Sequence, residues 1–386
     1  MQKAIAFPKR NRPAELAEHA LSFVKKNTVM CIAAFLAVMT VFLVPPDTRY
    51  AGYVDYKTLA CLFCTLAVVA ALKDIRFFYI LAKNIVRLFK STRACVLALV
   101  WITFLGSMLI ANDMALLTFL PLSYYVLKDC GRQKTVAFSF VMQTVAANLG
   151  GMLTPFGNPQ NLYLYTRFNI PTGAFTLTML PSFCLSVALI TGACFLFVKP
   201  EPLTVTDEMI RFDKSRSVLY AVLFLVSVLM VFRAIPYAIG LAVITVSLLV
   251  LDRHAVSSVD YPLLFTFVFF FIFAGNAARL DIVRDTLGAL LNKNVVLFSS
   301  LSCQFISNVP SAILLSNFTD NWQELLVGVN VGSVGTLISS LASLITFREY
   351  TIRYPGHTKG YFLLYTAVSF VFLGILLAFN LFLFRG

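Results

Sequence analysis

Apolar runs of membrane-spanning length recur along the whole chain. Residues 174–198 and 361–384 contain no charged side chain at all. An α-helix of about 20 apolar residues crosses the roughly 30 Å hydrocarbon core of a bilayer. In that core every backbone polar group has to find its hydrogen-bond partner inside the protein, which a helix does within a single segment. The runs therefore predict an all-α polytopic membrane protein.

Composition and charge exclude the soluble classes of protein. Of the 386 residues, 59% are hydrophobic and 13% are charged, whereas soluble domains carry about 25% charged residues. The 31 Lys and Arg against 18 Asp and Glu give a net charge of +13. No polar domain gathers these charges, so we expect no nucleic-acid partner. The eight Cys lie almost all within apolar runs, which indicates buried thiols rather than disulfides or a metal site.

Nine apolar runs are predicted to cross the membrane, and two more, 94–128 and 294–318, are broken in the middle and are predicted to be re-entrant. The crossing runs are 28–44, 56–72, 134–168, 174–198, 217–233, 236–251, 261–278, 323–347 and 361–384. With the N-terminus inside, about three-quarters of the Lys and Arg residues fall in cytoplasmic segments, as the positive-inside rule requires. We therefore expect an integral, multi-pass protein of the plasma (inner) membrane, with a cytoplasmic N-terminus and a C-terminus on the other side.

An internal repeat is visible along the chain. The tripeptide Val-Asp-Tyr opens an apolar run at residue 54 and again at residue 259, and an amphipathic stretch follows each of these runs. Each amphipathic stretch is followed by one of the two broken segments. Farther on, the segments Asn148 to Thr154 and Asn330 to Thr336 share the pattern N-x-G-x-x-x-T. Four matches in the same order indicate a duplicated unit.

The repeat divides the chain into four parts. Residues 1–27 form a cytoplasmic or interfacial segment, 28–198 the first repeat, 199–235 a linker with a connecting span, and 236–386 the second repeat. Each repeat has an even number of crossings, so the one extra span between them inverts the second repeat relative to the first. Inverted-topology repeats are the architecture of many secondary transporters, with the binding site at the midplane between the repeats.

Polar residues and helix breakers interrupt both repeats at matched positions. Pro and Gly break a helix or let backbones approach closely, and irregular backbone at membrane depth has to be buried in protein or to line a water-filled cavity. Freed carbonyls can coordinate a cation there, and half-helix N-termini and amides can hold an anion. The alternative is a Pro kink whose buried Asn satisfies its own backbone. The candidate substrate- and ion-binding residues are Asn112, Asp113, Asn148, Gly150, Gly151, Thr154, Pro155, Gly157, Asn158, Asn161, Ser307, Asn308, Asn330, Gly332, Ser333, Thr336 and Ser340.

Asp113 is the one acidic residue that the sequence places at membrane depth. An intramembrane carboxylate is costly and marks a functional site by default, so Asp113 could carry a coupling proton or bind Na⁺ together with backbone carbonyls. The alternative is an N-cap of the second half of the hairpin. If the coupling ion is Na⁺ rather than a proton, we expect it near Asn112, Asp113 and Asn308. Because no Arg or Lys falls within either break, a small anionic substrate would depend on dipoles, amides and hydroxyls.

These fragments resemble known permeases. The fragment Ala111 to Thr118 resembles the hairpin of arsenite permeases, and Asn148 to Asn161 is similar to citrate-transporter-like permeases. Ser307 and Asn308 resemble the start of the paired hairpin motif of divalent anion–sodium symporters. The chain is thereby identified as a member of the ion transporter superfamily, which also contains sodium/proton antiporters, and the resemblance covers nearly everything after residue 28.

The resemblance implies two re-entrant hairpins whose tips face two unwound helices. It also implies a transport domain that moves against a scaffold, usually within a homodimer. Carried over to this chain, Asn112 and Asp113 with the segment 148–161 would form one ion site. Ser307 and Asn308 with the segment 330–343 would form the other. The symporter motif ends in Thr, where this chain has Asp113 and, in the second hairpin, Val, so proton coupling stays open beside sodium coupling.

Together these features predict an ion-coupled secondary transporter of a small anion, either a di- or tricarboxylate such as citrate or an inorganic oxyanion, that works by alternating access. The coupling ion is Na⁺ or H⁺, no other cofactor is expected, and the partners are the anion and the lipid bilayer. The alternatives are an arsenite efflux permease or a sodium/proton antiporter, and more distantly a passive channel or an intramembrane enzyme. An enzyme would need a nucleophile–base set or metal ligands at membrane depth, and the sequence places no such cluster there.

Overall fold

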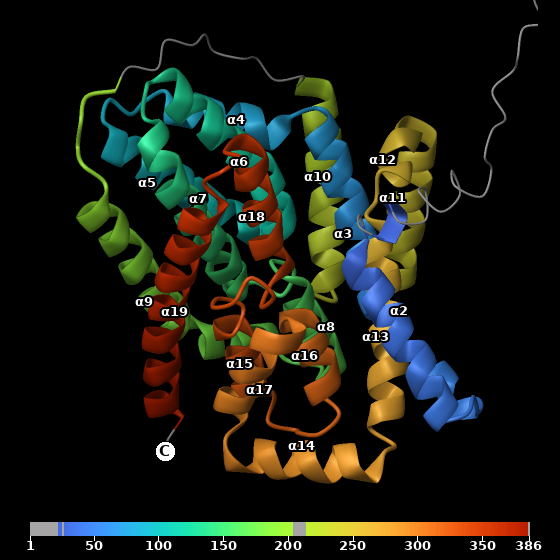
Figure 1. The fold of residues 1–386 in the computed structure, drawn as a ribbon. Coiled ribbons are helices and arrows are strands. Elements are labelled where there is room, and N and C mark those ends of the chain that lie inside the picture. Colours follow the sequence, from blue (N-terminus) through green and yellow to red (C-terminus); the bar gives the residue numbers. More distant parts are fainter. Residues whose placement is uncertain (1–21, 25–26, 204–213, 385–386) are drawn as a thin grey trace, which may run out of the picture.

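The computed structural model describes residues 22–24, 27–203 and 214–384 (Figure 1). Over this part of the chain the elements are helices, and the one β-type contact is an isolated bridge between Ser91 and Pro202. The all-α prediction is confirmed. The predicted N-terminal segment 1–27 lies almost entirely outside the described residues, as does part of the predicted linker.

Each predicted apolar run contains at least one helix. The first half of the chain forms α2 (Thr28–Leu43), η1 (Thr48–Gly52), α3 (Tyr56–Asp74), α4 (Phe77–Val86), α5 (Thr92–Ile110), α6 (Asn112–Asp129), α7 (Gln133–Gly150), η2 (Gly151–Leu153), α8 (Pro159–Arg167) and α9 (Thr172–Phe197). The second half forms α10 (Lys214–Val231), α11 (Tyr237–Leu251), α12 (Arg253–Ser257), α13 (Tyr261–Ala277), α14 (Asp281–Lys293), α15 (Val295–Ile306), α16 (Asn308–Leu315), α17 (Trp322–Val331), α18 (Leu341–Arg353) and α19 (Thr358–Leu383).

Fewer helices are long enough to cross a bilayer unaided than the sequence predicts. Within the described residues six helices have the length and hydropathy for this, namely α3, α5, α7 with η2, α9, α10 and α19, or up to seven if α13 and α14 count as one bent span. The predicted spans α2 and α11 are apolar helices of 16 and 15 residues. The run 323–347 is divided between α17 and α18 by an unwound stretch, because Gly, Ser and Thr interrupt it. The count of nine crossings stays a prediction.

Two amphipathic helices lie at opposite ends of the helical bundle. α4 lies across one end and α14 along the other (Figure 1), and we name the two ends of the bundle after them, the α4 end and the α14 end. α14 turns by 96° from α13. Its first residues include Asp281, Arg284 and Asp285, which are charged and exposed, so continuing straight into hydrocarbon would be costly. Both helices are the amphipathic stretches that the sequence identifies, and their placement across the ends of the bundle suits helices that lie along a membrane interface.

Two helical hairpins enter the bundle from these opposite ends. α5 and α6 enter from the α4 end and meet at Ala111, whereas α15 and α16 enter from the α14 end and meet at Ser307 (Figure 1). Both turning residues have a positive φ, 66° with ψ 155° at Ala111 and 74° with ψ 160° at Ser307. This backbone conformation costs a non-glycine residue roughly 1–3 kcal/mol, so it persists only where the surrounding structure stabilises it. The two predicted broken segments are therefore hairpins with the same strained turn.

Two more helices are interrupted beside the hairpins. α7 ends at Gly150, and η2 and a turn lead to α8; α17 ends at Val331, and nine unwound residues lead to α18. The residues before the new helices, Asn158 and Ser340, are extended, with φ −138° and ψ 143° at Asn158 and φ −149° and ψ 143° at Ser340. Pro159 occupies the first turn of α8, where the missing N–H costs nothing. The two interruptions thus end in the same way, at positions that the sequence repeat aligns.

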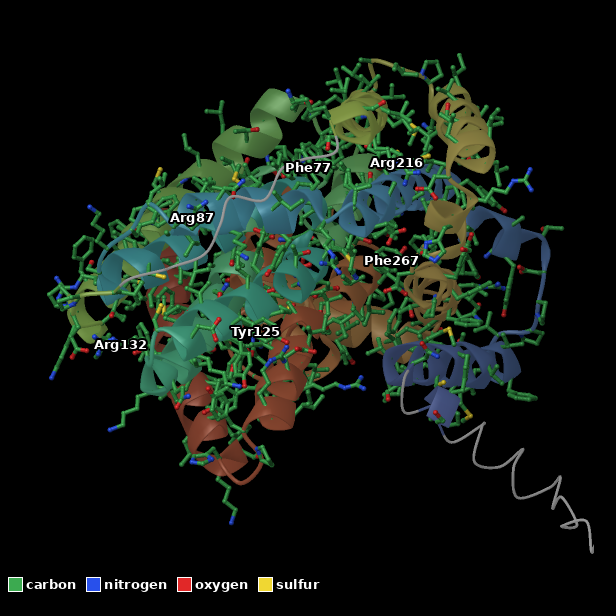
Figure 2. All side chains as sticks on the ribbon, turned by 90° about the horizontal axis from the view of Figure 1, so that it is seen from above. Phe77, Arg87, Tyr125, Arg132, Arg216 and Phe267 are labelled. Atoms are coloured by element: carbon green, nitrogen blue, oxygen red, sulfur yellow. The ribbon has the colours of Figure 1, made fainter. Side chains whose placement is uncertain are left out.

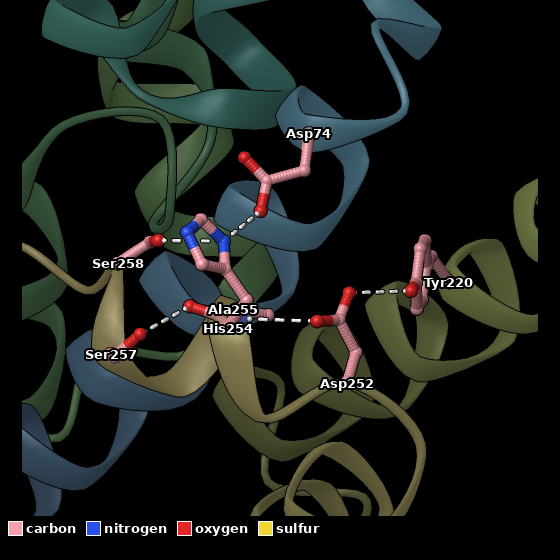
Figure 3. A network of polar contacts seen from close by, with 7 residues as sticks. All are labelled: Asp74, Tyr220, Asp252, His254, Ala255, Ser257 and Ser258. Carbon is pink, nitrogen blue, oxygen red and sulfur yellow. Dashed lines mark hydrogen bonds and ion pairs between the residues drawn. The ribbon is translucent and has the colours of Figure 1, made fainter.

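A small polar network fastens α12 at the α4 end. His254 Nδ1 lies 2.9 Å from Asp74 Oδ2 at the end of α3, and the Tyr220 hydroxyl of α10 donates to Asp252 Oδ2 at 2.6 Å (Figure 3). Asp252 Oδ1 also accepts from the backbone N–H of Ala255 and so caps α12. The network joins α3, α10 and α12, which the sequence separates widely.

His254→Gln is expected to remove a stabilising contact that depends on pH. The hydrogen bond with Asp74 raises the pKa of His254 above its ordinary value of 6.5. The contribution is therefore fully present below about pH 6.5 and is lost as pH rises through the raised pKa. We expect the wild type to melt at a higher temperature than His254→Gln at about pH 6 and at nearly the same temperature at about pH 9, in thermal unfolding of the detergent-solubilised protein. Asp74→Asn should behave in the same way, and a difference that does not change with pH would contradict the assignment.

Gly150→Ala is expected to destabilise the protein by about 1–3 kcal/mol through overpacking. A Cβ atom at Gly150 would lie 2.2 Å from the backbone oxygen of Phe104 and 2.6 Å from Ser107 Oγ, so α5 and α7 would have to separate. Gly192→Ala in α9 is the matched control, because nothing lies within 4 Å of its Cβ position. Thermal unfolding in detergent should show a lower melting temperature for Gly150→Ala and an unchanged or higher one for Gly192→Ala. Equal melting temperatures for the two variants would show that the close contact is absent.

Candidate substrate and ion site

The tips of both hairpins line one partly open cavity. It has a volume of about 420 Å³, and its polar lining residues include Asn112 and Asp113 from α6, Ser307 and Asn308 at the start of α16, and Ser340 before α18. Apolar side chains of α2, α13, α15 and α18 form most of the remaining wall. The break of the first repeat and the break of the second therefore face the same space, although about 200 residues separate them.

The two hairpin tips have the same local hydrogen bonding. The Asn112 side-chain oxygen accepts from the backbone N–H of Asp113 at 3.0 Å, and the Asn308 side-chain oxygen accepts from the backbone N–H of Val309 at 2.9 Å. Each Asn thus satisfies a free N–H at the start of its helix. Helix N-termini carry a partial positive charge and attract anions, so α6 and α16 both direct a positive dipole end toward the cavity.

The hairpins are held against the unwound segments by equivalent contacts. Thr154 Oγ1 donates to the backbone oxygen of Met108 at 2.9 Å, and Thr336 Oγ1 donates to the backbone oxygen of Gln304 at 2.9 Å. Met108 and Gln304 each lie four residues before the Asn of their own hairpin tip. The N-x-G-x-x-x-T pattern therefore ends in a Thr that makes the same hydrogen bond in both halves.

The glycines of the pattern have a steric role. A Cβ atom at Gly332 would lie 2.8 Å from the backbone of Ser300 in α15, as a Cβ at Gly150 would meet the backbone of α5. Within the first loop, a Cβ at Gly157 would lie 2.4 Å from the backbone oxygen of Gly151. These positions accept only glycine because two backbones approach each other closely.

Asn148 connects the two halves of the protein. Its side-chain oxygen accepts from Asn112 Nδ2 at 3.0 Å and from Ser340 Oγ at 2.8 Å, and its side-chain nitrogen donates to the backbone oxygen of Ser333 at 3.3 Å. Asn148 is fully buried. One amide in α7 therefore links the tip of the first hairpin to the unwound segment of the second repeat.

Asn330 makes the corresponding connection in the other direction. Its side-chain nitrogen donates to Asn161 Oδ1 at 2.6 Å and to the backbone oxygen of Leu326 at 2.8 Å. Its side-chain oxygen accepts from Asn158 Nδ2 and Gln160 Nε2, both at 3.4 Å. The sequence repeat aligns Asn330 with Asn148 and Asn158 with Ser340, so each Asn contacts the aligned position of the opposite half.

The predicted site residues fall into two groups. Asn112, Asp113, Ser307, Asn308 and Ser340 line the cavity. The remaining predicted residues do not line it but lie in or beside the unwound segments behind it; they are Asn148, Gly150, Gly151, Thr154, Pro155, Gly157, Asn158, Asn161, Asn330, Gly332, Ser333 and Thr336.

Two Gln residues belong to the same constellation and were missed by the sequence analysis. Gln160 lines the cavity beside Pro159. Gln304 donates to the backbone oxygens of Gly332 at 2.8 Å and Val334 at 3.2 Å, and accepts from the backbone N–H of Thr336 at 2.9 Å. A Gln within an apolar helical run is the signal that could have identified Gln304, since a buried amide has to be hydrogen-bonded.

The polar side-chain atoms at this site that lack a hydrogen-bond partner are oxygen acceptors. Asp113 Oδ1, Asn158 Oδ1 and Gln160 Oε1 are buried and have no hydrogen-bond partner among the described residues. No Lys or Arg is among the residues that line the cavity. Over the described ranges there is also no group of three His, Cys, Asp or Glu residues arranged to hold a metal ion. Oxygen acceptors of this kind suit a hard cation or a proton, while the helix N-termini suit an anion.

Comparison with known families agrees with this arrangement. The sequence model of one family, described as citrate transporter, matches residues 20–327, a range that contains both hairpins and the first unwound segment. The chain belongs to the citrate transporter family. Its membership makes it a polytopic membrane transporter of the secondary-transporter or permease class, and the predicted resemblance to that superfamily is confirmed.

Individual relatives of this transporter are similar over different lengths. It is 32% identical over 296 residues to the uncharacterized transporter MJ0456 of Methanocaldococcus jannaschii, covering 76% of this chain and 81% of the relative. It is 29% identical over 316 residues to the inner membrane protein YbiR of Escherichia coli, covering 80% of this chain and 83% of the relative. The silicon efflux transporter LSI3 of Oryza sativa is 30% identical over 147 residues, 38% of this chain and 30% of the relative.

Asn330→Ala is expected to lower transport at least about tenfold while leaving membrane insertion intact. The substitution removes the donor to Asn161 Oδ1 and leaves a buried acceptor unpaired, which costs about 1–3 kcal/mol, and a tenfold effect corresponds to about 1.4 kcal/mol. Asn380→Ala is the matched control, because Asn380 is also buried and accepts from Ser182 Oγ at 2.7 Å in the packing of α9 against α19. Two measurements separate the variants. One is the uptake of labelled citrate, succinate, arsenite and phosphate by proteoliposomes, and the other is the melting temperature. An equal loss of transport in both would contradict a specific role of Asn330.

Proposed function

We propose that this permease is an ion-coupled secondary transporter that moves a small anion across the cytoplasmic membrane by alternating access. The substrate class is a di- or tricarboxylate such as citrate, or an inorganic oxyanion. The observation that carries the proposal is the cavity between the two hairpin tips, which is lined by Asn112 and Asp113 from one half and by Ser307 and Asn308 from the other. Membership in the citrate transporter family supports the same substrate class.

The polarity of the cavity supports coupling to a cation. An anion at the hairpin tips would be attracted by the N-termini of α6, α16 and α18 and by amide and hydroxyl donors. Since no basic side chain lines the cavity, a substrate with more than one negative charge would need a cation bound beside it. The Asp113 carboxylate and the unpaired amide oxygens are the groups that would hold Na⁺ or a proton, with Na⁺ expected near Asn112, Asp113 and Asn308.

The arrangement of the two halves supports alternating access. The hairpins enter from opposite ends of the bundle (Figure 1), and matched hydrogen bonds join each hairpin to the unwound segment of its own half. Two units of this kind, related by an inverted repeat, have two equivalent states that open the same cavity to opposite sides. α4 and α14 would then be the interfacial helices that link the moving part to its scaffold.

The charge distribution supports an orientation with the α4 end in the cytoplasm. The view onto this end shows Arg87, Arg132 and Arg216 (Figure 2), and Arg132 forms an ion pair with Glu201. Basic segments next to membrane helices remain on the cytoplasmic side. In this orientation the protein lies in the plasma (inner) membrane with its N-terminus inside. The resemblance to the superfamily supports a homodimer as its form in the bilayer.

A second candidate function is efflux of a neutral or weakly charged metalloid acid, in the manner of an arsenite efflux permease; a sodium/proton antiporter is the related alternative. The observation that favours efflux of such a substrate is the same lack of basic lining residues, because an uncharged hydroxylated solute needs no counter-charge. The partial similarity to a silicon efflux transporter points in the same direction.

Gradient-driven uptake into proteoliposomes tests the proposal. We expect one of labelled citrate, succinate, arsenite or phosphate to accumulate when a Na⁺ or pH gradient is imposed, and to stop accumulating when the gradient is collapsed by an ionophore. Asp113→Asn should abolish the dependence on pH if Asp113 carries the proton, whereas unchanged coupling would show that Asp113 is not the proton carrier. Uptake that is indifferent to both gradients would contradict coupled transport and favour a channel.

A further inference from the structure

A large open cavity lies beside the cavity of the hairpin tips, on the side of the α14 end. It has a volume of about 590 Å³ and lies between the start of α3, the second halves of α8 and α13, and the end of α16. We call it the vestibule; its lining includes Asp55, Lys57, Tyr163, Arg167, Ile313 and Asn317. α13 runs toward the α14 end, and α16 returns toward it from the hairpin tip (Figure 1). The vestibule is therefore displaced from the tips toward that end.

The vestibule continues the helix faces that line the cavity of the hairpin tips. On each of α8, α13 and α16, a residue that lines the tip cavity is followed three or four positions later by one that lines the vestibule. These pairs are Gln160 and Tyr163, Phe270 and Ala274, and Pro310 and Ile313. Residues with this spacing lie on the same face of a helix. One crevice between the three helices thus leads from the vestibule to the hairpin tips.

Tyr163 closes this crevice between the two cavities. Its hydroxyl group is hydrogen-bonded to Ser316 Oγ, directly after α16, at 2.8 Å, and its ring centroid lies 5.5 Å from that of Phe271 in α13. Tyr163 is only 4% exposed. One side chain of α8 therefore contacts both other helices where the lining of one cavity gives way to that of the other. A solute in the vestibule would have to pass Tyr163 to reach the hairpin tips along this crevice.

The vestibule has the basic side chains that the tip cavity lacks. Lys57 and Arg167 line it, both are exposed, and neither forms an ion pair with any described residue. The acidic residue in the lining is Asp55, and both of its carboxylate oxygens are already hydrogen-bonded, since they accept from the backbone N–H and the hydroxyl group of Thr58. Two positive charges without an ion-pair partner therefore face the open space.

Arg167 also lines an adjoining open cavity. This cavity has a volume of about 480 Å³, lies beside α14 and the end of α16, and shares Arg167 and Asn317 with the vestibule. Its other charged lining residues are Asp320 and Arg284, and Arg284 is ion-paired with Asp281. Arg167 is thus the basic residue that lines both cavities, and it lies where they meet.

We propose that the vestibule is an anion-binding site in which Arg167 captures the substrate before it reaches the hairpin tips. This proposal rests on the proposed function and adds the residue that attracts the anion. A guanidinium group presents a planar fork of N–H donors that matches a carboxylate or an oxyanion, so the ligand is a small anion with such a group. Lys57 adds a second positive charge to the same cavity. Because Arg167 does not line the tip cavity, it acts on the capture of the anion and not on the passage of a bound one.

The chain offers a matched control in Lys293. Lys293 is the last residue of α14, is exposed, and lines neither the vestibule nor the adjoining cavity. Lys293→Gln removes one positive charge from the α14 end, as Arg167→Gln does. The two variants therefore distinguish the charge inside the vestibule from the overall charge of this end, and Arg167→Lys shows whether a positive charge at residue 167 is sufficient.

The first test measures the potential in the vestibule and needs no transport. Asn317→Cys places a thiol at an exposed position shared by the two cavities, and its rates of reaction with a negatively and a positively charged methanethiosulfonate reagent are compared in detergent at low salt. The protein without this substitution gives the background of the native thiols, of which Cys184 is exposed.

The ratio of the rate with the negative reagent to that with the positive one should fall about threefold or more when Arg167→Gln is added. It should stay unchanged with Lys293→Gln. Citrate should slow the modification when Arg167 is present, and this protection should be lost in Arg167→Gln. Equal rate ratios in the Arg167→Gln and Lys293→Gln backgrounds, or no protection by citrate when Arg167 is present, would overturn the proposal.

The second test is gradient-driven uptake of labelled citrate by proteoliposomes. Arg167→Gln should raise KM about threefold or more and leave kcat within about twofold of the wild type, because a charge at the rim of a site changes the rate of capture. The difference in KM should shrink at high ionic strength, where salt screens the charge. Arg167→Lys should have a KM closer to that of the wild type, and Lys293→Gln should have the wild-type KM.

The two tests separate failure of the proposal from failure of the proposed function. A fall in kcat with an unchanged KM in Arg167→Gln would overturn the capture role, while coupled transport would still stand. If the wild type takes up no citrate under any gradient, citrate transport fails, and the thiol modification still decides whether the vestibule binds an anion at Arg167.

Discussion

The structure depends on one constraint, that backbone polar groups freed at membrane depth have to be hydrogen-bonded inside the protein. Four helices are interrupted in the middle of the bundle, and each interruption exposes N–H and C=O groups that a continuous helix would pair. Side chains replace the missing partners: Thr154 and Thr336 donate to hairpin carbonyls, and Asn112 and Asn308 accept from N–H groups at the hairpin tips. The polar residues at the centre of this apolar chain are therefore required by the fold before any substrate is considered.

The same requirement links the two halves of the protein. Asn148 bonds to Ser340 and to the backbone of Ser333, and Asn330 bonds to Asn158 and Asn161. Each of these amides is buried, and leaving one partner unpaired would cost about 1–3 kcal/mol. These hydrogen bonds therefore fasten the two unwound segments to each other. Asn112 and Ser340 both bond to Asn148 and also line the cavity, so the network reaches the cavity wall directly.

The breaks could be predicted from the sequence because Pro, Gly, Asn and Ser stand out within apolar runs, and the alignment of Thr154 with Thr336 followed from spacing alone. The division between lining and supporting residues could not be predicted, since a helix turn decides whether Gly150 faces a neighbouring backbone or the cavity. Gln304 was missed because its aligned position in the first hairpin is Met108, so the repeat drew no attention to it. The lengths of α2 and α11 likewise depend on where each helix is capped, which hydropathy does not report.

The two hairpins share a backbone geometry but differ in chemistry at one position. Asp113 and Val309 both donate their backbone N–H to the preceding Asn side chain, so the N-cap does not require a carboxylate at this position, and Val309 demonstrates that the turn forms without one. The Asp113 side chain is thus free of the capping role, and its Oδ1 has no partner among the described residues. A carboxylate at membrane depth that the local fold does not need marks a functional position rather than a structural one. The two hairpins therefore differ in charge at one position of otherwise matched turns: the first repeat has a carboxylate where the second has an apolar side chain.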